Sequence, residues 1–153
     1  ALQAALEGKT QKEILSAAAQ GAQMALQSMD YIAAAPSCIR RLKQLEQDVS
    51  DTTSDDALRS DLYSLYGTGL ESIDVFTAVF GIFLHKKKDV FGAICLAASL
   101  GGDTDTIAAL VGTLCTAYAG RHNIPGEIVD RVVRQNGLCL EELSGKIRQA
   151  FWN

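Results

Sequence analysis

The chain has 153 residues, of which 48% are hydrophobic and 21% are charged, and its formal net charge is −4. This length can bury one hydrophobic core, and the acidic balance without a basic stripe excludes the electrostatic footprint of a nucleic-acid-binding protein. No apolar run is long enough to span a bilayer, and the first residues lack the layout of a signal peptide, so we expect no membrane partner.

Helical patterns cover almost the whole chain, because it has only two prolines and its apolar residues recur at intervals of three and four. The first helix is predicted to begin at a capping box of Thr10 and Glu13 and to run to about Ala35, where Pro36 stops it. An amphipathic helix over about 37–49 should follow on the surface.

The run Gly67-Thr68-Gly69 interrupts the helical pattern in the middle of the chain. The polar stretch 50–56 is predicted to be a loop, and a short helix then ends near Tyr66. Thr68 and Glu71 have the spacing of another capping box, which predicts a helix from there to the basic run at 86–88.

After a glycine pair at 101–102, a long helix over about 105–118 is apolar or small on every side. A helix of this composition should be central, because each face needs a neighbour. Ala108, Gly112 and Thr116 form a ridge of small residues that would let another helix approach closely. A compact all-α bundle, expected to be a single domain over residues 1–153, is completed by helices over about 90–100, 125–136 and 138–151.

The loop before the central helix carries the candidate metal ligands, Asp103, Asp105 and Thr106. In a loop freed by glycines, two carboxylates and a hydroxyl can converge and offer the hard oxygen ligands that Mg²⁺ or Mn²⁺ prefers. Buried carboxylates are costly unless they are paired or bound to a metal. A simpler interpretation stays open, in which Asp103 or Thr104 only caps the helix.

The run LGGDTDTIAALVGTLCTAYAG, which begins at Leu100, resembles the signature near the C-terminus of the ADP-ribosylglycohydrolase family. The resemblance implies an all-α fold in which Asp103, Asp105 and Thr106 bind a pair of Mg²⁺ or Mn²⁺ ions. It extends over about residues 56–153 and is weak before them.

Upstream, the run YGTGL at 66–70 resembles the family's second C-terminal element, where a glycine turn and an apolar residue face ADP-ribose. By this resemblance Gly69 and Leu70 would contact the nucleotide. A helix start flanked by glycines explains the same residues without a ligand, so both interpretations stay open.

The family's N-terminal glutamate, its Thr-Asp-Asp metal motif and its glycine-rich phosphate loop are not found in this sequence. The nearest similar run, DTTSDD at 51–56, lacks the order of that motif and is interpreted as a solvated loop. We therefore expect the chain, which opens at Ala1 without a methionine, to be the C-terminal portion of a larger fold. An N-terminal segment would supply the acid/base group and the rest of the metal shell, and no catalytic residue is identified within the chain.

The resemblance implies a divalent-metal-dependent hydrolase that removes ADP-ribose from a protein side chain or a related conjugate by breaking the glycosidic bond at C1″. ADP-ribose or an ADP-ribosylated protein would then be its partner. The alternative is a non-catalytic relative that binds ADP-ribose or has a structural role. A third possibility is a helical interaction module without a metal, which would require the motif to be a coincidence.

Other reactive residues have simpler interpretations. His85 and the lysines at 86–88 end an apolar helix, where cations compensate the helix dipole, and the lysines should be solvated. His122 is expected in a surface loop. The cysteines form no C-x-x-C pair and suit a cytoplasmic or other reducing compartment; they are Cys38, Cys95, Cys115 and Cys139.

Overall fold

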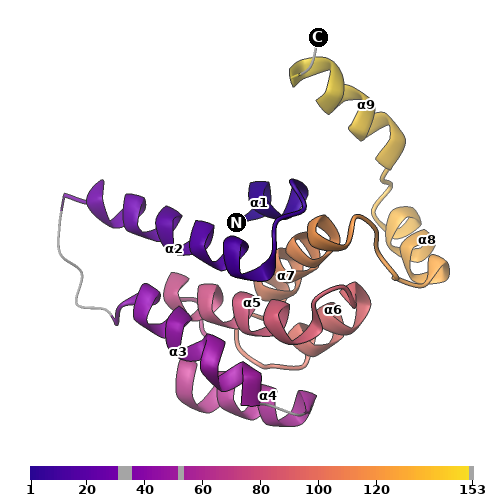
Figure 1. Cartoon of the computed structure of the whole chain (residues 1–153). Helices are drawn as coiled ribbons and strands as arrows, with labels where there is room; N and C mark the ends of the chain where they lie inside the picture. Colours follow the sequence, from indigo (N-terminus) through magenta and orange to yellow (C-terminus); the bar gives the residue numbers. More distant parts are fainter. Residues whose placement is uncertain (31–35, 52–53, 152–153) are drawn as a thin grey trace. The chain divides into compact units, whose positions relative to one another are not determined.

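The structure is a computed structural model that describes residues 1–30, 36–51 and 54–151, and every regular element in these ranges is helical (Figure 1). The predicted all-α fold is confirmed. Contacts divide the chain into an N-terminal unit, Ala1–Asn123, and a C-terminal unit, Ile124–Asn153. The expectation of a single domain stays a prediction.

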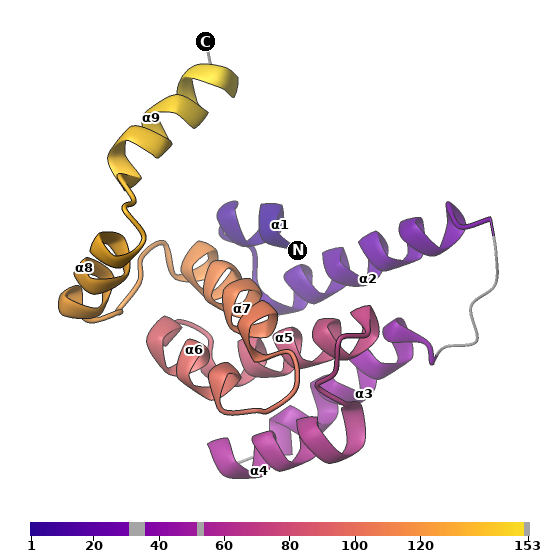
Figure 2. The ribbon, with the colours of Figure 1, turned by 180° about the vertical axis from the view of Figure 1, so that it is seen from behind.

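The N-terminal unit is built around α5. Its elements in chain order are α1 (Leu2–Leu6), α2 (Gln11–Gln27), α3 (Cys38–Asp51), α4 (Asp55–Asp61), the π-helix η1 (Leu62–Tyr66), α5 (Ser72–Lys86), α6 (Val90–Ala98) and α7 (Thr104–Ala119). In both ribbon views α5 lies between α3 and α7, and it contacts both (Figures 1 and 2). α6 packs along α7, and α1 contacts the same helix.

The core centres on the apolar side chains of α5. Phe83 is fully buried and meets the ring of Tyr118 edge-on, with 5.3 Å between the ring centroids. Burying one such side chain contributes about 2–3 kcal/mol to folding. At Gly81 an added Cβ would lie 2.9 Å from a methyl carbon of Leu62, so η1 approaches the backbone of α5 closely.

The capping box at the start of α2 is confirmed, because Thr10 Oγ1 accepts the Glu13 N–H and the Glu13 carboxylate accepts the Thr10 N–H. The predicted end of this helix is wrong. α2 ends at Gln27, where Ser28 caps it, and the apolar Met24 near this end is 70% exposed, so packing does not extend the helix. The predicted last turn, at 31–35, lies outside the described residues.

The second predicted capping box is wrong. α5 begins at Ser72, and its N-cap residue, Glu71, makes no side-chain cap hydrogen bond. Thr68 is only 5% exposed and belongs to the preceding turn, so its side chain is not available at the helix start. The short helical segment before the turn ends at Tyr66 as predicted, with its last residues in the π-helix.

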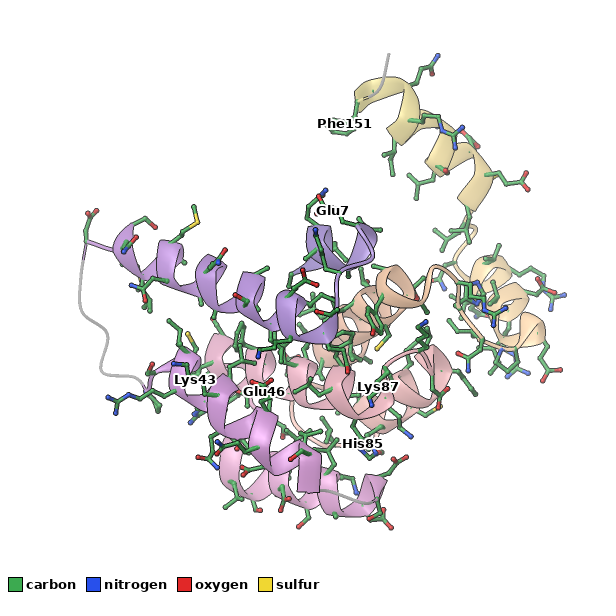
Figure 3. All side chains as sticks on the ribbon, in the orientation of Figure 1. Glu7, Lys43, Glu46, His85, Lys87 and Phe151 are labelled. Atoms are coloured by element: carbon green, nitrogen blue, oxygen red, sulfur yellow. The ribbon has the colours of Figure 1, made fainter. Side chains whose placement is uncertain are left out.

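One cluster of charges corrects two details of the prediction: Asp55 and Asp56 belong to α4 and not to a loop, and Lys86 is shielded, whereas Lys87 and Lys88 are exposed as predicted. Ser54 caps α4, and Asp55, in its first turn, pairs with Lys86 Nζ at 2.6 Å and with His85 Nε2 at 2.8 Å. The Lys86 side chain is 15% exposed. His85, on α5, is labelled in Figure 3 with Lys87, the residue that follows this helix, and both border a hollow lined by residues of α3 and α5. Residues 52 and 53 lie outside the described residues.

In α7, the predicted end of the helix and the predicted ridge of small residues are confirmed, whereas the predicted burial on every side is wrong. It ends at Gly120, which adopts the left-handed conformation at φ 70°. An added Cβ at Gly112 would lie 3.0 Å from Ile94, so α6 uses the small ridge for its close approach. The helix is nevertheless not buried on every side. Leu110 is 48% exposed, and Thr106, Ala109 and Thr113, at helical spacing on the same side, are exposed as well.

The C-terminal unit contains α8 (Gly126–Gln135) and α9 (Leu140–Phe151). Both are amphipathic, and neither has a buried residue. Phe151, labelled in Figure 3 at the end of α9, is 77% exposed. Across the ranges that the structure describes, no helix combines the length and apolar character needed to cross a membrane.

Candidate functional site

Two glycine-containing segments meet at the candidate site. The Asp103 N–H donates to the Thr68 carbonyl at 2.8 Å. At Gly102, where φ is 77°, an added Cβ would lie 2.0 Å from the Thr68 carbonyl oxygen. Only glycine accommodates both this backbone conformation and this approach. The loop before α7 is therefore fixed against the turn before α5.

The Asp103 side chain does not cap α7. Asp103 is the N-cap residue, but its side chain makes no cap hydrogen bond to the helix backbone. Its Oδ1 instead accepts the hydroxyl of Thr106 at 2.9 Å. The simpler interpretation of Asp103 as only a helix cap is therefore not supported, since its carboxylate faces a hydroxyl instead of backbone N–H groups.

Asp103 and Thr106 border a groove of about 530 Å³ between α1, α5 and α7. Its wall is mainly apolar and includes Leu2, Leu70, Val75, Phe76, Val79, Phe80, Leu110 and Leu114. Leu70 is 84% exposed at this groove. The groove thus combines two polar groups, the Asp103 carboxylate and the Thr106 hydroxyl, with a surface that suits an apolar or aromatic part of a ligand.

The structure brings together three of the five residues predicted for the site. Leu70, Asp103 and Thr106 line one groove, whereas Asp105 and Gly69 do not line it. The Asp105 side chain is exposed in the first turn of α7, and Gly69 lies half-buried in the turn. The metal-binding and nucleotide-binding roles of all five residues stay predictions.

The Asp103 and Thr106 oxygens would provide only part of a coordination sphere for a divalent ion. Ligands at about 2.1 Å from Mg²⁺ in octahedral geometry lie about 3 Å from their neighbours. The 2.9 Å between Asp103 Oδ1 and Thr106 Oγ1 is close to that spacing, but it is also the length of their hydrogen bond, so both oxygens would enter one coordination sphere only if the hydroxyl proton turned away from the carboxylate. Among the described residues, no three His, Cys, Asp or Glu side chains form a metal-binding group. Further ligands would have to come from water, from Asp105 or from another segment.

Sequence patterns did not identify the residues that support the turn. Arg41 Nη1 donates to the Tyr66 carbonyl and to Asp74, and the Tyr66 hydroxyl donates to Asp48. Burial, together with the Asp48 carboxylate, raises the pKa of Tyr66. Arg41 lies on an amphipathic helix predicted for the surface, so no spacing signal distinguished it from the neighbouring Arg40.

Comparison with known proteins gives one finding. The sequence model of a family described as ADP-ribosylglycohydrolase matches residues 1–153, the whole chain. The match includes the part before residue 56, where the resemblance of the sequence motifs is weak. No curated protein and no solved structure matches the chain.

Proposed function

Because the chain belongs to the ADP-ribosylglycohydrolase family, we propose that it serves in metal-dependent hydrolysis of an ADP-ribosyl linkage, with Asp103, Asp105 and Thr106 as metal ligands. The family implies a hydrolase of ADP-ribose linkages and is generally metal-dependent. The observation that carries the metal assignment is that the Asp103 carboxylate and the Thr106 hydroxyl lie side by side at the edge of a groove.

In this proposal, a bound pair of Mg²⁺ or Mn²⁺ ions would supply the chemistry of a Lewis acid, orienting ribose hydroxyls, polarising the leaving group and helping to activate water. Asp103 and Thr106 would hold the ions through oxygen atoms that already face one another. Asp105, one residue before Thr106, would turn its side chain toward the same ions. None of these residues serves as the general base, because a carboxylate bound to cations has little basicity.

The groove supports the substrate part of the proposal. Leu70 lines the same groove as Asp103, so a ligand whose ribose hydroxyls lie at the metal could extend its nucleoside over Leu70 and Phe76. Gly69 would allow that ligand to approach the backbone of the turn. The bond broken is the one at C1″ of ADP-ribose, to a protein side chain or a related conjugate.

An N-terminal segment of the same fold is proposed to supply the acid/base group and the remaining metal ligands. A cytoplasmic or other reducing compartment suits the protein, since all four of its cysteines lie in the described ranges as free thiols. One of them, Cys115, is buried, and this burial raises its pKa to about 12, so it is a core residue and not a nucleophile.

The experiment that tests the proposal measures release of ADP-ribose from peptides modified on serine or on arginine. The chain is assayed together with the proposed N-terminal segment, with Mg²⁺, with Mn²⁺ or with a chelator. We expect release only with a metal, and a loss of about a hundredfold in Asp103→Asn, the scale typical of removing one charge-stabilising group.

Two results would overturn the proposal. Release that is unaffected by the chelator and by Asp103→Asn would remove the metal from the mechanism. Metal-dependent binding of ADP-ribose without release from either peptide would favour the alternative, a non-catalytic relative that binds ADP-ribose.

A further inference from the structure

Arg41, on α3, connects three elements through a single nitrogen. Its Nη1 donates to the Tyr66 carbonyl at 2.7 Å, at the end of η1, and to Asp74 Oδ1 at 2.9 Å, in the first turn of α5. The two side chains are 23% and 20% exposed. This pair is therefore more shielded than the surface ion pairs whose contribution is usually small.

Asp74 also fills the space beside the turn that follows η1. An added Cβ at Gly67 would lie 2.5 Å from Asp74 Oδ2, and one at Gly69 would lie 3.4 Å from the same oxygen. The carboxylate therefore packs directly against both glycines. Through Asp74, the position of Arg41 is coupled to the path of the backbone between Gly67 and Gly69.

Thr68 lies between these glycines and connects the turn to the candidate site. It is 5% exposed, and its carbonyl accepts the Asp103 N–H at 2.8 Å. The same carbonyl oxygen is the atom that an added Cβ at Gly102 would meet. A displacement of the turn would therefore move the loop that carries Asp103.

From this series of contacts we infer that Arg41 and Asp74 are positioning residues, which hold the Thr68 carbonyl where it accepts the Asp103 N–H and so set where the Asp103 carboxylate lies. Neither residue lines the groove, so each acts through the turn and not by touching a ligand. The inference rests on the proposed function where it refers to metal binding. The hydrogen bond from Asp103 to Thr68 can be measured without any ligand.

The test compares Arg41→Met with Lys86→Met in the whole chain. Methionine keeps an apolar stem and removes the donors. Lys86, whose side chain is 15% exposed, also makes an ion pair, with Asp55, but at the opposite end of α5 from the turn. The readout is the hydrogen-exchange rate of the Asp103 amide, measured by NMR and set against the global stability of each variant.

We expect Arg41→Met to raise the exchange rate of the Asp103 amide by about tenfold more than its loss of global stability explains. In Lys86→Met, the loss of global stability should explain the whole change in that rate. Arg41→Lys, which keeps a charged donor, should restore part of the protection. Unchanged exchange in Arg41→Met, or an equal rise in Lys86→Met, would overturn the positioning role. Should Arg41→Met fail to fold, Asp74→Asn supplies the same comparison.

Titration with Mn²⁺ alone extends the test to the proposed function. Supporting groups outside the ligand set typically change metal affinity by about 10–100-fold, so Arg41→Met should weaken binding by about tenfold while Lys86→Met leaves it unchanged. Equal affinities in the two variants would count against the inference. Absence of Mn²⁺ binding by the unmodified protein, assayed together with the proposed N-terminal segment, would instead contradict the proposed function, and the exchange rates would still decide the positioning role.

Discussion

Gly102 is the residue on which the arrangement of the candidate site depends most directly. Its φ of 77° disfavours any side chain, and an added Cβ would lie 2.0 Å from the Thr68 carbonyl oxygen. These are separate constraints, one on backbone conformation and one on space. They can be measured separately, because Gly120 has the first constraint without the second.

Gly102→Ala is expected to destabilise the fold more than Gly120→Ala. Both positions have positive φ, at 77° and 70°, so both variants carry the cost of a left-handed alanine, about 1 kcal/mol or more. An added Cβ at Gly120 meets nothing within 4 Å. The difference in unfolding free energy, measured with urea, should therefore be about 1–3 kcal/mol and report the collision with Thr68. Equal losses would contradict the close approach.

Between elements, the charge cluster at Asp55 joins the start of α4 to the end of α5. The hydrogen bond from Lys86, and after it the one from His85, lowers the pKa of Asp55 from its ordinary value of 3.8, against the opposing effect of burial. A carboxylate with a lowered pKa in the folded state stabilises the fold above its ordinary pKa, and this contribution is lost as the pH falls through the folded-state value.

Asp55→Asn should therefore lower the unfolding free energy near neutral pH, by about 1 kcal/mol because the Asp55 side chain is 49% exposed. The difference from the unmodified protein should shrink as the pH falls below 3.8. Urea unfolding at a series of pH values measures it. Asp56→Asn is the matched control: its carboxylate is 83% exposed, so a smaller effect is expected at neutral pH. A decrease in unfolding free energy that is the same at every pH would contradict the electrostatic explanation.

For the helices, the sequence predicted which segments are helical better than it predicted where each helix begins and ends. The box at Thr10 was identified correctly because a capping box is a local interaction that needs no tertiary partner. The equivalent spacing at Thr68 gave a wrong helix start, because that residue is engaged by a distant loop. Burial around α7 was overestimated for a related reason, since composition does not say whether a neighbour covers each face.

For the whole molecule, the candidate site was predictable only in its motif residues. The run from Leu100 onward carried Asp103 and Thr106, and the structure places them with Leu70 in one groove. The support from Arg41 and Asp74 was not predictable, because it depends on contacts between α3, η1 and α5 that leave no spacing pattern. The family assignment concerns the whole chain, whereas the metal at 103–106 is a proposal about a few of its oxygen atoms.

The measurement that tests the central claim most directly is calorimetric titration of ADP-ribose into the protein together with the proposed N-terminal segment, with Mg²⁺ or with a chelator. Asp103→Asn and Asp105→Asn remove one charge each, and Asp130→Asn, on α8, is the control. We predict binding that requires Mg²⁺, weakens by about tenfold or more in the first two variants and is unchanged in the third. Binding that is equally strong with the chelator, or in Asp103→Asn and Asp105→Asn, would contradict a metal site in this loop.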